Sequence, residues 1–161
     1  MKDSGFLMKL KEEGKLKLVD ESEDISKSYL IKSEKCMKVA KLAYEANIFE
    51  NSISEAYYSM YNCVLALFFK CGIKCENHSG SVILIKRLFK LDELHVFFSK
   101  IKKERIDNQY YVPVIDSEPI KKNQCKNLLD LVSDFNIEIK VYIQNLTNEK
   151  IKEIRDKFEN L

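Results

Sequence analysis

The residue whose position most clearly suggests chemistry is Arg105. It continues a helical stripe of apolar residues by one further step of four. A guanidinium in this core-facing register must be paired, because it stays protonated and desolvating it is costly. It either pairs with a carboxylate at the helix end or lines a pocket for an anion such as phosphate. The stripe that leads to it consists of Leu91, Leu94, Phe98 and Ile101.

The segment that follows Arg105 is unusually rich in hydrogen-bonding groups for a helix end. It reads Ile-Asp-Asn-Gln-Tyr-Tyr over residues 106–111, and it includes Asp107 and Tyr110. Such a segment favours a binding site at this end of the helix as much as it favours a structural role for the arginine.

Three tyrosines, Tyr57, Tyr58 and Tyr61, fall within about one helical turn. We expect Tyr57 to be a core residue whose hydroxyl is hydrogen-bonded, with the other two at helix interfaces. Stacking on a nucleic-acid base is the alternative. His78 lies beside a serine and a glycine in a predicted loop and would be the titrating group near a site, whereas His95 is expected to be half exposed.

The sequence gives little support for a metal site, a glycine-rich phosphate loop or a catalytic nucleophile. Neither histidine has a second histidine or an aspartate at ligand spacing, so no metal site is predicted. Four glycines in the whole chain leave no glycine-rich phosphate loop. No serine or cysteine nucleophile can be argued, and no cofactor is expected.

The helix that organises the rest of the chain spans Ser52 to Gly72. Ser52 and Glu55 have the spacing of a capping box at its start, and Gly72 stands where a left-handed glycine ends many helices. Apolar residues occupy most sides of its last two turns, so this helix should be central in a bundle.

The remaining pattern predicts an all-α, up-and-down helical bundle with short additional helices, in a single domain over residues 1–161. A helix capped by Asp20, with a stripe from Ile25 to Ala43, should pack antiparallel to the central helix. The other expected elements are an arm over 1–20, a polar loop over 73–80, two short helices over 82–105, a long helix capped by Ser117, and a C-terminal helical tail over 147–161 capped by Thr147.

Composition supports a single helical domain. The chain has 161 residues, 45% of them hydrophobic, and a net charge of +2, which is too small for attraction of nucleic acid in bulk. Five cysteines within apolar patterns, without a signal peptide, predict a reducing, cytoplasmic location. The longest apolar run is far shorter than the ~20 residues of a membrane span.

Together, these residues resemble the HEPN domains. The resemblance is carried by EAYYSMYNCVLALFFKCG over residues 55–72, then His78-Ser-Gly, then Arg105 with Tyr110 five residues later. It is strongest to a stand-alone branch with an AYYAMFYAA-like helix, an HSG loop and an Arg-x-x-x-Asp-Tyr-like segment. The resemblance implies a helical bundle that forms a homodimer and is often encoded beside a minimal nucleotidyltransferase, as a toxin–antitoxin pair.

Many proteins of this family are metal-independent ribonucleases whose Arg-x(4–6)-His motif holds RNA phosphate. Arg105 matches the arginine, but residues 109–112 contain no histidine, and Gln109 replaces the acidic residue of the Asp-Tyr variant. Other members are adenylylated on a tyrosine beyond the motif. Tyr110 and Tyr111 stand near that place, without the complete motif.

Three functions therefore remain open. The first is a homodimeric partner protein whose groove, lined by Arg105 and Tyr110, binds nucleotide or RNA phosphate and which associates with a nucleotidyltransferase. Tyr57 and His78 are further candidate binding residues in this case. The second is a ribonuclease in which Arg105 acts with Tyr110, Asp107 or His78 in place of the missing histidine; a tyrosine in that role would need a pKa well below ~10. The third is a non-catalytic interaction module in which the arginine is only structural.

Overall fold

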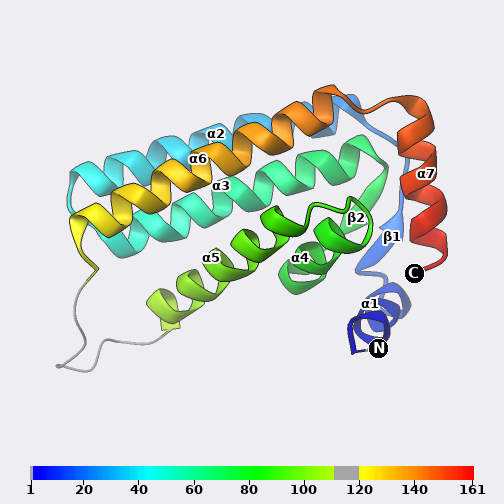
Figure 1. The fold of residues 1–161 in the computed structure, drawn as a ribbon, viewed down its shortest axis with the longest axis horizontal. Coiled ribbons are helices and arrows are strands. Elements are labelled where there is room, and N and C mark those ends of the chain that lie inside the picture. The colour runs from blue at the N-terminus through cyan, green and yellow to red at the C-terminus, as the bar shows by residue number, and fades with distance from the viewer. Residues whose placement is uncertain (1, 111–119) are drawn as a thin grey trace.

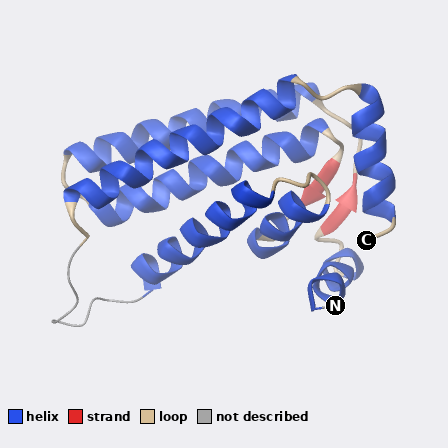
Figure 2. Ribbon diagram, viewed as in Figure 1, coloured by secondary structure: helices blue, strands red, loops and turns tan. Residues whose placement is uncertain are grey.

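The computed structural model describes residues 2–110 and 120–161, except for the side chains of Lys2 and of residues 107–110. The fold is an all-α bundle with a two-stranded sheet at one end (Figures 1 and 2). The elements are α1 (Lys2–Glu12), β1 (Leu16–Leu18), α2 (Glu23–Glu45), α3 (Phe49–Lys70), β2 (Ile73–Cys75), α4 (His78–Arg87), α5 (Asp92–Tyr110), α6 (Lys122–Gln144) and α7 (Asn148–Glu159).

Helices α2, α3 and α6 lie side by side along the long axis, and α5 packs against α3 (Figure 1). The predicted central helix is therefore confirmed as α3, which is in contact with α2, α4, α5, α6 and β2. From Met60 to Phe68 every α3 residue except Tyr61 is buried. Gly72 has a φ of +65°, as expected of the glycine that ends this helix.

The predicted start of α3 was wrong. The helix begins at Phe49 rather than after Ser52, and Asn47, with a φ of +59°, turns the chain from α2. Ser52 is buried, and its hydroxyl donates to the backbone oxygen of Ala40 at 2.7 Å. This hydroxyl joins two helices, so the capping-box spacing with Glu55 is incidental.

The start and inner face of α2 also differ from the prediction. Ser22 caps the helix by accepting a hydrogen bond from the backbone N–H of Ile25, and Asp20 does not. Ala40 of the predicted stripe is buried, but Ile25 is exposed, and the other buried positions are Ser26 and Ser33. Small polar residues line this face because α2 and α3 are joined through serine hydroxyls, which an apolar-stripe argument does not detect.

A buried polar network joins α2, α3 and α6. Ser33 and Ser59 each donate a hydrogen bond to the other's backbone oxygen at 2.8 Å. Asn136 of α6 donates to the Ser59 hydroxyl, also at 2.8 Å. Because these groups are buried and bonded to one another, they fix the register of the three long helices.

The predicted polar loop over 73–80 was partly wrong. Ile73–Cys75 forms strand β2, which pairs antiparallel with β1 so that Leu16 faces Cys75. His78 is already the first residue of α4, and Asn77 caps that helix by accepting from the backbone N–H of Gly80 at 2.8 Å. Each strand has only three residues, and an alternation of apolar and polar residues cannot be recognised in so short a segment of the sequence.

The C-terminal helix α7 is tied to the end of α3 by Arg155. Its Nη1 donates to the backbone oxygens of Val19, Cys71 and Gly72 at 3.0, 3.0 and 3.1 Å. A Cβ at position 72 would overlap this guanidinium. The predicted cap of α7 by Thr147 is confirmed, since its hydroxyl accepts from the backbone N–H of Lys150.

Two helices were expected over 82–105, and α4 and α5 confirm them, with Lys90 at a φ of +59° in the turn between them. The predicted cap at Ser117 lies outside the described residues. The described part of α6 begins at Lys122, where the Lys121 backbone N–H donates to the side chain of Gln124 at 2.9 Å.

Candidate functional site

Arg105 lies near the end of α5 and faces the tyrosines of α3. The carbon at the centre of its guanidinium is 5.2 Å from the centre of the Tyr57 ring and 5.6 Å from that of Tyr58. Both distances are within the range of a cation–π contact. Its Nη1 also donates to the Tyr58 hydroxyl at 3.0 Å. The arginine is half-buried, so these rings hold the charge at the boundary between core and surface.

Tyr57 connects this arginine to His78. The tyrosine is fully buried, and its hydroxyl lies 2.6 Å from Nδ1 of His78. Among the described residues this nitrogen is the hydroxyl's only hydrogen-bond partner. A buried hydroxyl hydrogen needs an acceptor, so we assign Tyr57 as donor and Nδ1 as acceptor. His78 is then neutral, with its proton on Nε2.

The surroundings of His78 favour this neutral form. Burial is the largest cause that lowers its pKa, and the positive charges of Arg105 and Lys102 lower it further. The ring also stacks on Tyr61, with ring centres 3.9 Å apart. Burial raises the pKa of the Tyr57 phenol well above its ordinary value and that of Tyr61 to about 12, so both hydroxyls keep their protons.

Lys102 completes the cluster from the turn of α5 before Arg105. Its Nζ donates to the Ser79 hydroxyl at 2.8 Å, in the first turn of α4. Burial, followed by repulsion from Arg105, lowers the pKa of this ammonium. Two cations of α5 and the positive end of the α4 dipole therefore meet at one place.

The structure brings together three of the residues predicted to bind nucleotide or RNA, namely Arg105, Tyr57 and His78. Asp107 and Tyr110 fall on the last turn of α5, but their side chains lie outside the described residues, and Tyr111 does so entirely. His95 faces another way, with Nδ1 2.9 Å from the backbone oxygen of Val82.

Lys102 and Ser79 were missed as site residues. The signal for Lys102 was its spacing, because it precedes Arg105 by three positions and so shares its side of a helix. Ser79 could not be found in this way, since only the folded structure shows that the first turn of α4 meets this part of α5.

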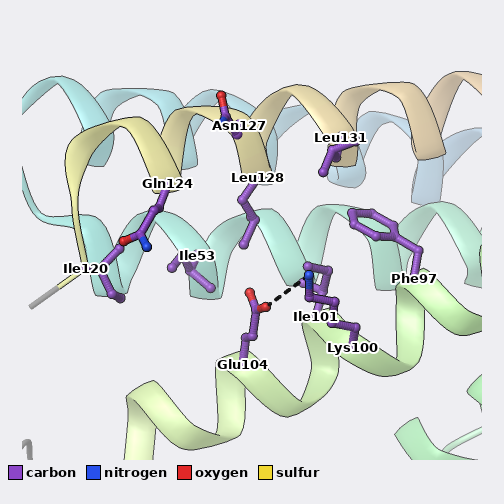
Figure 3. Close-up of a pocket in the computed structure, with 10 residues that line it drawn as sticks. All are labelled: Ile53, Phe97, Lys100, Ile101, Glu104, Ile120, Gln124, Asn127, Leu128 and Leu131. Atoms are coloured by element: carbon purple, nitrogen blue, oxygen red, sulfur yellow. Dashed lines mark ion pairs between the residues drawn. The ribbon is translucent and has the colours of Figure 1, made fainter. Parts of the chain in front are cut away.

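A separate groove of about 460 Å³ lies between α5 and α6 (Figure 3). Leu128 of α6 and Ile53 of α3 extend into the space between these helices, and Lys100 pairs with Glu104 across its α5 side at 3.9 Å. The lining is largely apolar and its charges are paired. The groove is thus chemically unlike the cationic cluster, which is the better candidate site.

The described parts of the chain, 2–110 and 120–161, hold neither a metal site of the usual kind nor a membrane-spanning helix. These residues contain no group of three or more histidine, cysteine, aspartate or glutamate side chains placed to hold a metal ion. None of their helices is both long enough and apolar enough to cross a membrane.

The chemistry available to the cluster is the binding of an anion. Arg105 and Lys102 supply charged N–H donors, and His78 in its assigned tautomer supplies a neutral one at Nε2. The same assignment leaves His78 without a lone pair at Nε2, while Tyr57 occupies the one at Nδ1. In this state His78 is a hydrogen-bond donor and not a general base.

An all-α bundle with an arginine near the end of its third long helix, α5, facing a tyrosine-rich central helix, is the arrangement expected of the HEPN domains. The HEPN domain family matches residues 26–140, which is more than half of the chain. The chain belongs to this family.

Two relatives extend the comparison. A protein of Methanocaldococcus jannaschii, named as a putative toxin, is 28% identical over 99 residues, covering 61% of this chain and 67% of its own. A UPF0332 protein of Pyrococcus horikoshii is 28% identical over 149 residues, covering 89% of this chain and all of its own.

Proposed function

We propose that this chain is a toxin-like HEPN protein that binds the phosphate of RNA or of a nucleotide at Arg105. The name of the M. jannaschii relative supports the toxin-like role. A homodimeric state and a minimal nucleotidyltransferase as partner are implied by the family resemblance and form part of the same proposal.

The observation that carries the proposal is the setting of Arg105. Its guanidinium is held over two tyrosine rings, and Lys102 and His78 lie close enough to it that its charge affects the pKa of each. The two like charges, those of Arg105 and Lys102, would be stabilised by an anion, and phosphate oxygens suit a planar guanidinium.

Binding of a fluorescently labelled single-stranded RNA, measured by anisotropy in EDTA, tests this function. Arg105→Gln should weaken binding by about tenfold, because one charge-assisted contact is lost. Lys103→Gln is the matched control, since it removes one charge from an exposed position of the same helix. Equal affinities of the wild type and Arg105→Gln would refute the proposal and favour the non-catalytic interaction module.

Metal-independent RNA cleavage is the second candidate, because His78 lies beside Arg105 although the sequence motif lacks its histidine. The hydrogen bond from Tyr57 must be released before Nδ1 of His78 can accept a proton. The RNA recovered from the binding assay should be examined on a denaturing gel. Cleavage by the wild type that is lost in both Arg105→Gln and His78→Gln would support a ribonuclease, whereas intact RNA would restrict the function to binding.

A further inference from the structure

Lys102 is a charged group of the cluster that lies outside the sequence motif and to which the proposed function assigns no ligand group of its own. It is half-buried, and its Nζ donates to the Ser79 hydroxyl at 2.8 Å. No carboxylate of the described residues forms an ion pair with it. Other lysines of the fold behave differently: Lys70 and Lys140, which are similarly buried, pair with glutamates of α2.

Keeping this ammonium next to Arg105 has a cost. Desolvation and repulsion by the guanidinium both act against the charge of Lys102. Its amine still has hydrogens to donate after the bond to Ser79, and the Ser79 hydroxyl can accept that bond while donating its own hydrogen. Ser79 also lies in the first turn of the ten-residue helix α4, where the helix dipole is positive.

Lys102 and Arg105 are neighbours on α5, but their side chains define two separate positions. Residues three apart are neighbours on one side of a helix, with Cβ atoms about 5–6 Å apart. Arg105 is directed to the tyrosines of α3, and Lys102 to the first turn of α4. One anionic group at each position would offset the like-charge repulsion.

We propose that Lys102 and Ser79 bind a second phosphoryl group, next to the one held at Arg105, so that the preferred ligand carries two consecutive phosphoryl groups. This inference rests on the proposed function, since Arg105 supplies the first position. The two phosphoryl groups belong either to a polynucleotide backbone or to a nucleoside diphosphate.

Calorimetric titration in EDTA with matched ligands tests the second position. Uridine diphosphate is compared with uridine monophosphate, and the dinucleotide pUpU with UpU. In the wild type, the added phosphoryl group should strengthen binding by about tenfold in at least one pair. The pair that shows the gain identifies its source as a diphosphate or as a polynucleotide backbone.

The variants separate this proposal from the proposed function. Lys102→Gln should abolish the gain, Ser79→Ala should reduce it, and Lys102→Arg and the control Lys103→Gln should retain it, with folding checked by circular dichroism. An equal gain in wild type and Lys102→Gln, or no gain in the wild type with either pair, overturns the second position and leaves the first intact. Loss of monophosphate binding in Arg105→Gln supports the first position independently.

Discussion

Replacing Tyr57 with phenylalanine should raise the pKa of His78. In the wild type the neutral ring accepts the Tyr57 hydroxyl hydrogen at Nδ1. Protonation of the ring would remove that acceptor and leave a buried donor unsatisfied, at a cost of about 1–3 kcal/mol. Phenylalanine has no such donor and keeps the ring that packs on Phe98 and Arg105, so this cost disappears.

Burial and the two neighbouring cations still act on His78 in the variant, so its pKa should stay below the ordinary value of 6.5. Loss of the hydrogen bond should also lower the free energy of unfolding by about 1 kcal/mol at a pH where the ring is neutral.

Two-dimensional ¹H–¹⁵N NMR of the imidazole rings measures both the tautomer and the pKa. The protein has two histidines, and we predict opposite tautomers for them. His78 should carry its proton on Nε2, whereas His95 should carry it on Nδ1, because that atom lies 2.9 Å from a backbone oxygen. The His95 signals should be the same in wild type and Tyr57→Phe. A proton on Nδ1 of His78 in the wild type, or an unchanged His78 pKa in the variant, would refute the assignment.

Three further predictions concern stability. Arg155→Ala should lower the free energy of unfolding in urea by about 2 kcal/mol, because three backbone oxygens lose a charged donor, while exposed Lys152→Ala should have little effect. Ser59→Ala should lower the free energy of unfolding by about 1–3 kcal/mol, because it leaves buried hydrogen-bond partners unsatisfied, whereas the control Ser99→Ala, at an exposed position, should change it little. Because the pKa of His78 is lower in the folded state than in the unfolded chain, its contribution to stability is present above pH 6.5 and decreases as the pH falls below that value; His78→Gln should flatten this part of the curve.

The elements with long apolar repeats could be predicted from sequence. Helix α3 is recognisable because most of its sides are apolar, and α6 because its stripe continues from Cys125 to Ile139. Helix α2 was recognised and its inner face was predicted in part: Ala40 is buried, but Ile25 is exposed, and buried Ser26 and Ser33 were missed. Hydroxyls that are satisfied across helices look, in sequence, like exposed residues.

In the candidate site, too, features of a single helix could be predicted and contacts between helices could not. Arg105 could be singled out because it continues an apolar stripe, a local feature of one helix. The Tyr57–His78 hydrogen bond and the Lys102–Ser79 hydrogen bond each join two helices that are far apart in sequence. No spacing rule relates such pairs, and the tautomer of His78 follows only once the burial of Tyr57 is known.

The salt dependence of RNA binding tests the central claim, that Arg105 binds a phosphate, most directly. Affinity for a single-stranded RNA is measured at a series of salt concentrations for the wild type, Arg105→Gln and the control Lys103→Gln. Each phosphate contact contributes about 0.7 to the slope of log affinity against log salt. We predict that Arg105→Gln binds more weakly with a slope shallower by about 0.7, while Lys103→Gln matches the wild type. Equal slopes and affinities for all three proteins would contradict a phosphate contact at Arg105.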